Sequence, residues 1–292
     1  MSVTAARMAP DARRGRRARK ARTGRTVAYY VISTVLAAIF LFPVVWTAWS
    51  SIHGTQATGT ADNGVGFDNY HRLFKYGEGF GRYFANSVIV SALTVAGTLA
   101  ISLLGGYAFA YLPFRGRGVL FMAALAILMV PYTTLLIPLY ILLQWLSLQN
   151  TLVGLSLVLI MLQLPFGLFM MRNSFEALPA ELEDAALVDG CSAWKVMTRV
   201  LLPGVIPGLV TVALFAFLAS WNEFVAPLIF LSDGTKFTLP VALVNLRSGT
   251  FGSVDFGALE AGIAASAAPC VLLFLFLQRY YVTGFSAGAI KA

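Results

Sequence analysis

The chain has 292 residues, of which 58% are hydrophobic and only 12% charged, and its mean hydropathy is +0.77. Charged side chains are too few to cover a soluble globule of this size, so lipid must cover much of the surface. The composition excludes an ordinary soluble domain and predicts an all-α polytopic membrane protein.

Residues 1–26 form a basic arm that supplies most of the net charge of +8. Nine Lys and Arg side chains lie between Arg7 and Arg25. Basic residues beside a first span are retained in the cytoplasm, so we expect a disordered cytoplasmic arm. The alternative is that the arm binds nucleic acid. We favour its interpretation as a cytoplasmic retention signal and expect no nucleic acid as partner.

Five long uncharged stretches follow the arm, and each can cross a bilayer, which requires about 20 apolar residues. They are residues 27–50, 84–112, 119–171, 204–231 and 261–277. The third has 53 residues and would form a helix on the order of 80 Å long, against a hydrocarbon core of roughly 30 Å. It must fold back, and the polar run 144–150 is the natural turn. Six transmembrane helices result.

An even number of spans places both termini on one side, which the basic arm makes the cytoplasm. The first span, 27–50, should stay as an anchor, followed by an extracytoplasmic loop at 51–83. A core at 84–282 then holds five transmembrane helices and a cytoplasmic loop at 172–203, and residues 283–292 form a cytoplasmic tail.

The chain lacks the usual chemistry of an energy source. No Lys is followed by Ser or Thr, so the phosphate-binding pattern G-x-x-x-x-G-K-[ST] is absent. Ion-driven transporters carry ionisable residues inside their spans, and here only Glu223 qualifies. It is either an acid at the outer end of a span or a group that lines a pore.

Catalysis and metal binding are also unsupported. Ser286 stands in a G-x-S-x-G pattern, but a membrane helix precedes it where a hydrolase requires a strand. His53 and His71 lie in the outer loop, without clustered Cys or carboxylates, so we expect neither a metal site nor a catalytic residue.

The cytoplasmic loop at 172–203 is acidic in its first half. From Glu176 to Asp189 it contains five acids and no base, and an anionic lipid surface repels such a segment. The pattern predicts a short helix that stops at Gly190. A second helix should begin after Ser192 and end near Pro203. A docking protein suits this loop better than lipid does.

The spacing within this loop resembles the EAA signature of permease subunits of ABC importers. Asp184-Ala185-Ala186 is followed by Gly190 after three residues and by Val200-Leu201-Leu202-Pro203 after nine more. Asp184 replaces Glu and Val200 replaces Ile, both conservatively. The resemblance implies the type I permease fold and a coupling helix that docks on an ATPase. The coupling residues it implies are Glu183, Asp184, Ala185, Ala186, Asp189, Gly190 and Pro203.

Two further segments are similar to the sugar-importing, maltose-type branch. They are Trp221-Asn222-Glu223-Phe224 and the closing run at 274–291. This resemblance implies a sugar as substrate. Asn and Glu flanked by aromatics suit the hydroxyls and apolar faces of a sugar, so we expect Trp221, Asn222 and Glu223 to line the translocation path.

The partners implied are a second permease subunit, two ATPase subunits that hold ATP and Mg²⁺, and an external solute-binding protein. The chain itself would need no cofactor and would lie in the bacterial inner membrane. A secondary transporter or channel for another polar solute is the alternative, and a membrane enzyme acting through Ser286 is a third class.

Overall fold

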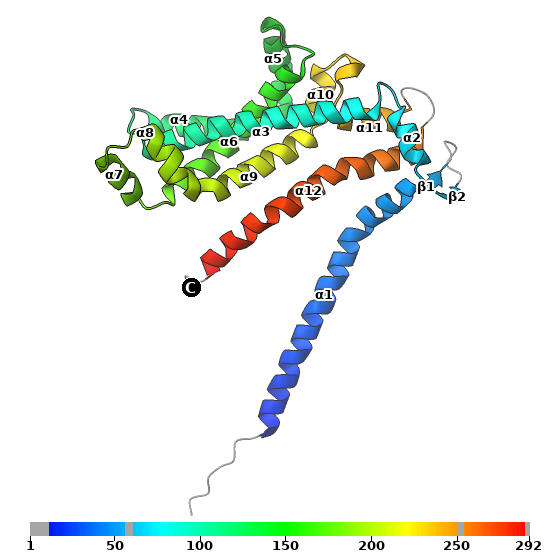
Figure 1. The fold of residues 1–292 in the computed structure, drawn as a ribbon, viewed down its shortest axis with the longest axis horizontal. Helices are drawn as coiled ribbons and strands as arrows, with labels where there is room; N and C mark the ends of the chain where they lie inside the picture. Colours follow the sequence, from blue (N-terminus) through cyan, green and yellow to red (C-terminus); the bar gives the residue numbers. More distant parts are fainter. Residues whose placement is uncertain (1–11, 56–60, 250–253, 290–292) are drawn as a thin grey trace, which may run out of the picture.

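The computed structural model describes residues 12–55, 61–249 and 254–289 and is almost entirely helical (Figure 1). Two short strands, β1 (His53–Thr55) and β2 (Ala61–Val65), pair antiparallel with His53 opposite Val65. The first helices in chain order are α1 (Ala12–Ile52), α2 (Asp68–Phe74), α3 (Phe80–Tyr111), α4 (Arg117–Ala126), the 3-10 turn η1 (Ile127–Met129) and α5 (Tyr132–Trp145). The remaining elements are α6 (Leu152–Glu176), α7 (Glu181–Val188), α8 (Ala193–Lys195), the π-helical η2 (Val196–Leu201), α9 (Leu202–Trp221), α10 (Val225–Phe230), the 3-10 turn η3 (Gly234–Lys236), α11 (Leu239–Arg247) and α12 (Phe256–Ala289).

Among the described residues, five helices are long and apolar enough to cross a membrane. A sixth span results if α4 with η1 and α5 count as one. The six-span prediction is confirmed when this pair is counted as one span, and the third span is sharply bent. Its two halves meet at 105°, because Val130 is extended at ψ 124° and Pro131 has no N–H to continue the helix.

The turn predicted at 144–150 is present. Ser147 and Asn150 adopt left-handed conformations, with φ of 55° and 54°, and the Asn150 side chain accepts hydrogen bonds from the amides of Ser232 and Asp233. These bonds join the turn to the segment after α10, so the two connections stabilise one another.

The basic arm differs from the expectation of disorder, because α1 already begins at Ala12. Ala, Arg and Lys, which dominate this stretch, all have high helix propensity, and the span that follows extends their helix without a break. Residues 1–11 lie outside the described part of the chain, as do 290–292 in the expected tail.

The centre of the molecule is a bundle of α3, α6 and α9, which lie side by side along most of their length (Figure 1). Small residues let α3 and α6 approach closely, as is usual between membrane helices. Gly97, Gly105 and Gly106 of α3 all lie against side chains or backbone of α6. Membrane-spanning α12 contacts α9 and α1, and α1 leans away from the bundle.

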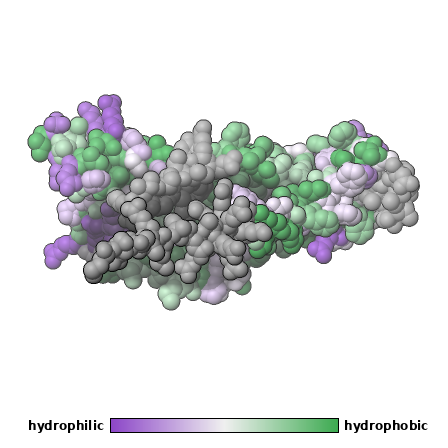
Figure 2. Space-filling model, turned by 90° about the horizontal axis from the view of Figure 1, so that it is seen from below, coloured by the Kyte–Doolittle hydropathy of each residue, from purple (hydrophilic) through white to green (hydrophobic). Residues whose placement is uncertain are grey.

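Opposite ends of this bundle carry different elements. The short helices α7 and α8 lie at one end, and α2, α11 and the strands lie at the other (Figure 1). Figure 2 shows hydrophilic residues gathered at the end that holds α7 and α8. The 172–203 loop and the outer connections are therefore separated by the full length of α3, as opposite membrane surfaces require.

The sequence predicted that the helix after Ser192 ends near Pro203. It does not end there. Ser192 is the N-cap of α8, but the chain continues helically through η2 into α9, and the whole of Ala193–Trp221 forms one candidate span. A proline ring clashes with the carbonyl four residues earlier. The wider π-helical turn at Val196–Leu201 immediately precedes Pro203 and accommodates it at the start of α9.

Candidate functional site

The first candidate site is the helix α7 with the turn that ends it. The first turn of α7 contains three acids, Glu181, Glu183 and Asp184. Their negative charges interact favourably with the positive end of the helix dipole. Gly190 adopts φ 78°, and its amide donates to the Leu187 carbonyl at 3.0 Å. The left-handed stop predicted at this glycine is confirmed.

One side of α7 packs against the bundle. Ala186 is only 8% exposed and lies in a cluster with Met171 and Phe175 of α6 and with Met197 and Leu201 of η2. The members of this cluster are apolar and buried, so it fixes α7 to the adjacent ends of the membrane helices.

Glu183 also faces the bundle. Its carboxylate accepts a hydrogen bond of 3.2 Å from the Tyr107 hydroxyl of α3. Burial raises the pKa of Glu183 above its ordinary value, and the hydrogen bond from Tyr107 opposes that rise only in part. Glu183 is thus a contact within the subunit.

The other side of α7 is open. Asp184, Ala185 and Asp189 are exposed. So are two large apolar side chains, Val188 at the end of α7 (87% exposed) and Trp194 on the following helix α8 (63%). Such a mixed acidic and apolar surface is suited to a protein partner. Of the predicted coupling residues, Asp184, Ala185, Asp189 and Gly190 lie on this open surface. Pro203, also exposed, lies beyond it in α9.

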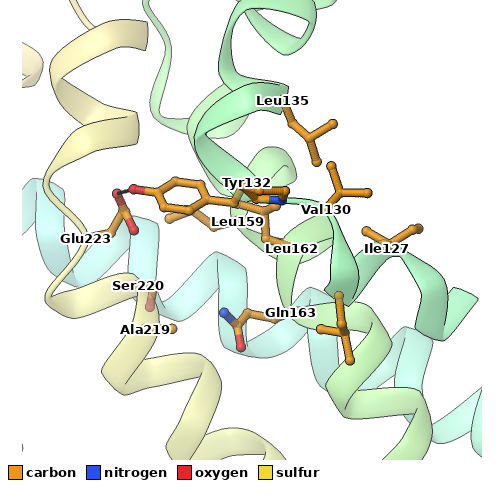
Figure 3. A pocket seen from close by; sticks show the side chains of 12 residues that line it. Ile127, Val130, Tyr132, Leu135, Leu159, Leu162, Gln163, Ala219, Ser220 and Glu223 are labelled. Atoms are coloured by element: carbon orange, nitrogen blue, oxygen red, sulfur yellow. Dashed lines mark hydrogen bonds between the residues drawn. The ribbon is translucent and has the colours of Figure 1, made fainter.

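The second candidate site is a pocket of about 390 Å³ at the break in the third span, shown in Figure 3. Its polar lining residues are Tyr132 from α5, Gln163 from α6, and Ser220 and Glu223 from the end of α9 and the loop after it. The rest of the lining is apolar and comes from η1, the break after it, α5, α6 and α9. The pocket therefore combines a few polar groups with apolar walls, as small-molecule sites do.

Glu223 is held at the edge of this pocket. One carboxylate oxygen, Oε1, accepts from the amides of Val225 and Ala226, at 2.9 and 3.0 Å, and from the Tyr132 hydroxyl at 3.3 Å. Glu223 and Tyr132 point toward one another across the pocket (Figure 3). The two amides fix the carboxylate at the start of α10, so its charge is positioned by backbone and does not depend on a flexible partner.

The other two predicted path residues do not share the pocket. Trp221 is buried, its indole N–H donates to the Ser266 carbonyl at 3.1 Å, and its ring packs against Phe84 and Phe217. Asn222 donates to the Leu218 carbonyl at 2.8 Å and lines a separate, smaller pocket of about 160 Å³. The structure thus brings only Glu223 of the three to the larger pocket.

Tyr132 and Gln163 were missed by the sequence reasoning. Gln163 carried a signal, since it is a polar side chain in the middle of a long apolar stretch. Tyr132 carried almost none, because its place in the pocket depends on the bend at Pro131. Within the described ranges, no three His, Cys, Asp or Glu side chains gather where they could hold a metal ion.

Comparisons with known proteins show the family of the chain. Residues 99–286 match the family described as binding-protein-dependent transport system inner membrane component. The chain belongs to this family. The permease is therefore a multi-pass protein of the bacterial inner membrane.

Two relatives cover most of the permease. The arabinooligosaccharides transport system permease protein AraQ of Halalkalibacterium halodurans is 36% identical over 77% of this chain and 79% of its own length. The diacetylchitobiose uptake system permease protein DasC of Streptomyces coelicolor is 33% identical over 89% and 95%. A solved bacterial ABC transporter involved in import of the acidic polysaccharide alginate has the same fold, with a TM-score of 0.73 at 21% identity over 88% and 96%.

Proposed function

We propose that the chain is the membrane-spanning permease of an ATP-driven importer for a sugar or oligosaccharide. It forms half of a heterodimeric translocation path and couples to ATPase subunits through the 172–203 loop. The observation that carries the proposal is family membership over residues 99–286, a segment that includes the whole of this loop. ATP and Mg²⁺ belong to the ATPase subunits, since the sequence has no phosphate-binding loop of its own.

A sugar is supported by the relatives and by the chemistry of the pocket. AraQ and DasC are named for oligosaccharide substrates. Tyr132, Gln163 and Glu223 offer hydroxyl, amide and carboxylate groups between apolar walls, which suits the hydroxyls and apolar faces of a sugar ring.

The docking part rests on the open surface of α7. Asp184, exposed in the first turn, presents negative charge beside exposed Val188 and Trp194. A basic, partly apolar groove on an ATPase subunit is complementary to such a surface. The ATPase then moves α7, and with it the membrane helices, between inward-facing and outward-facing arrangements.

The test is reconstitution of the permease with the second permease, ATPase and solute-binding proteins encoded beside it. We expect uptake of a labelled oligosaccharide that stops when ATP is withheld. Uptake that persists without the ATPase would contradict the importer and favour a secondary transporter or channel.

Asp184→Lys tests the docking surface in the same complex. We expect the variant to insert in the membrane but to lose ATPase subunits during purification, with uptake falling at least about tenfold, because a like charge replaces a complementary one. Glu78→Lys is the control, since it makes the same charge change at an exposed position just before α3, at the far end of the bundle. Equal ATPase retention in both variants would refute docking through α7.

A further inference from the structure

Tyr107 connects the coupling helix to a membrane helix through a single side chain. It belongs to the last two turns of α3 and is 6% exposed. Its hydroxyl donates to the carboxylate of Glu183 on α7, at 3.2 Å and across 76 residues of sequence. A hydrogen bond is directional, so this one depends on the relative position of α3 and α7.

The ring of Tyr107 is packed against two other aromatic rings and cannot follow α7 freely. It lies edge-on to Phe175, with centroids 5.8 Å apart, and against Tyr111 at 5.5 Å. Phe175 and Met171 are fully buried. The donor is therefore fixed to α3 and α6, so a displacement of Glu183 either breaks the hydrogen bond or moves the membrane helices.

At its other end, α3 is tied to the segment that leads into α11. The Ser87 hydroxyl oxygen accepts from the amide of Leu239 at 2.8 Å. Asn86 donates to the carbonyls of Thr235 and Phe237, at 3.0 and 2.9 Å. One continuous helix thus bridges the coupling helix and the outer connections.

We propose that Tyr107 is a positioning residue that transmits motion of the coupling helix to α3 by holding Glu183. The inference rests on the proposed function, because it assumes that an ATPase displaces α7. Glu183 then connects α7 to α3 within the subunit, whereas its neighbour Asp184 contacts the ATPase subunit. The burial that raises the pKa of Glu183 also makes loss of its hydrogen-bond donor costly.

Tyr107→Phe tests this step, since it retains the buried ring and removes only the hydroxyl. In the reconstituted complex we expect the ATP hydrolysed per solute imported to rise about fivefold or more, the factor that corresponds to loss of one such hydrogen bond. Tyr111→Phe is the matched control. Its hydroxyl lies in the same cluster but donates to the Phe175 carbonyl at 3.1 Å and not to Glu183, so the ratio should stay near that of the wild type.

Replacement of Glu183 separates positioning from packing. Glu183→Gln keeps an acceptor for the Tyr107 hydroxyl and should raise the ratio less than Glu183→Ala does. A wild-type ratio in Tyr107→Phe, or an equal rise in Tyr111→Phe, would overturn the inference. Absence of ATP-dependent uptake by the wild-type complex would instead overturn the proposed function.

Amide hydrogen exchange gives a second measurement that does not need transport. In the purified complex, exchange in α7 should be faster in Tyr107→Phe than in Tyr111→Phe, because α7 has lost its fixed contact with α3. Equal exchange in the two variants would contradict the positioning role of Tyr107, even where uptake is too low to measure.

Discussion

Gly106 gives the most direct test of the packing between α3 and α6 beside α7. A Cβ atom at this position of α3 would lie 2.5 Å from Cβ of Met171 and 3.0 Å from the backbone nitrogen of Arg172 in α6. Carbon atoms in contact normally lie about 3.5–4.0 Å apart. Gly106→Ala therefore forces α3 and α6 apart by about 1 Å, since the obstruction includes backbone and cannot rotate away.

The expected cost follows from two opposing terms. Overpacking of this kind costs about 1–3 kcal/mol, and the higher helix propensity of Ala returns at most about 1 kcal/mol. We expect a net loss of about 1–2 kcal/mol, which for a chain of this size lowers Tm by roughly 2–8 °C.

The assay is thermal unfolding of the detergent-solubilised complex, followed by the loss of its monodisperse peak in size-exclusion chromatography. Gly81→Ala is the matched control in the same helix, because no atom outside its own turn lies within 4 Å of a Cβ there. Its Tm should be equal to or slightly above that of the wild type. A Gly106→Ala protein as stable as Gly81→Ala would refute the close approach of α3 and α6.

Two further predictions concern α7. Gly190→Ala places a side chain at φ 78°, which costs roughly 1–2 kcal/mol. The loop after α7 should therefore be cleaved faster in limited proteolysis than in the wild type. Unchanged cleavage would show that Gly190 needs no left-handed conformation. Burial raises the pKa of Glu183 above its usual 4.5, so this group stabilises packed α7 below pH 4.5 and loses that contribution as pH rises through the raised pKa. Amide exchange in α7, corrected for intrinsic rates, should quicken over that window in the wild type but not in Glu183→Gln, and identical profiles would refute the shift.

Hydropathy and spacing in the sequence determined much of this protein. The number of spans follows from stretch lengths, because the bilayer fixes how many apolar residues one crossing needs. The stop at Gly190 follows from a glycine after an acidic helical run, because only glycine adopts that conformation at little cost. Both are local properties, and neither depends on which segments lie together.

The tertiary structure alone decided which residues of these segments face one another. Glu183 and Asp184 are adjacent acids in one helical turn, and only the position of Tyr107, 76 residues away from Glu183, turns one inward and leaves the other exposed. The bend at Pro131 likewise brings Tyr132 to Glu223, while Trp221, two residues before Glu223, packs against Phe217. Side chains on consecutive residues of a helix point in different directions, so the partner of each is set by the helices around it and not by its neighbours in the chain.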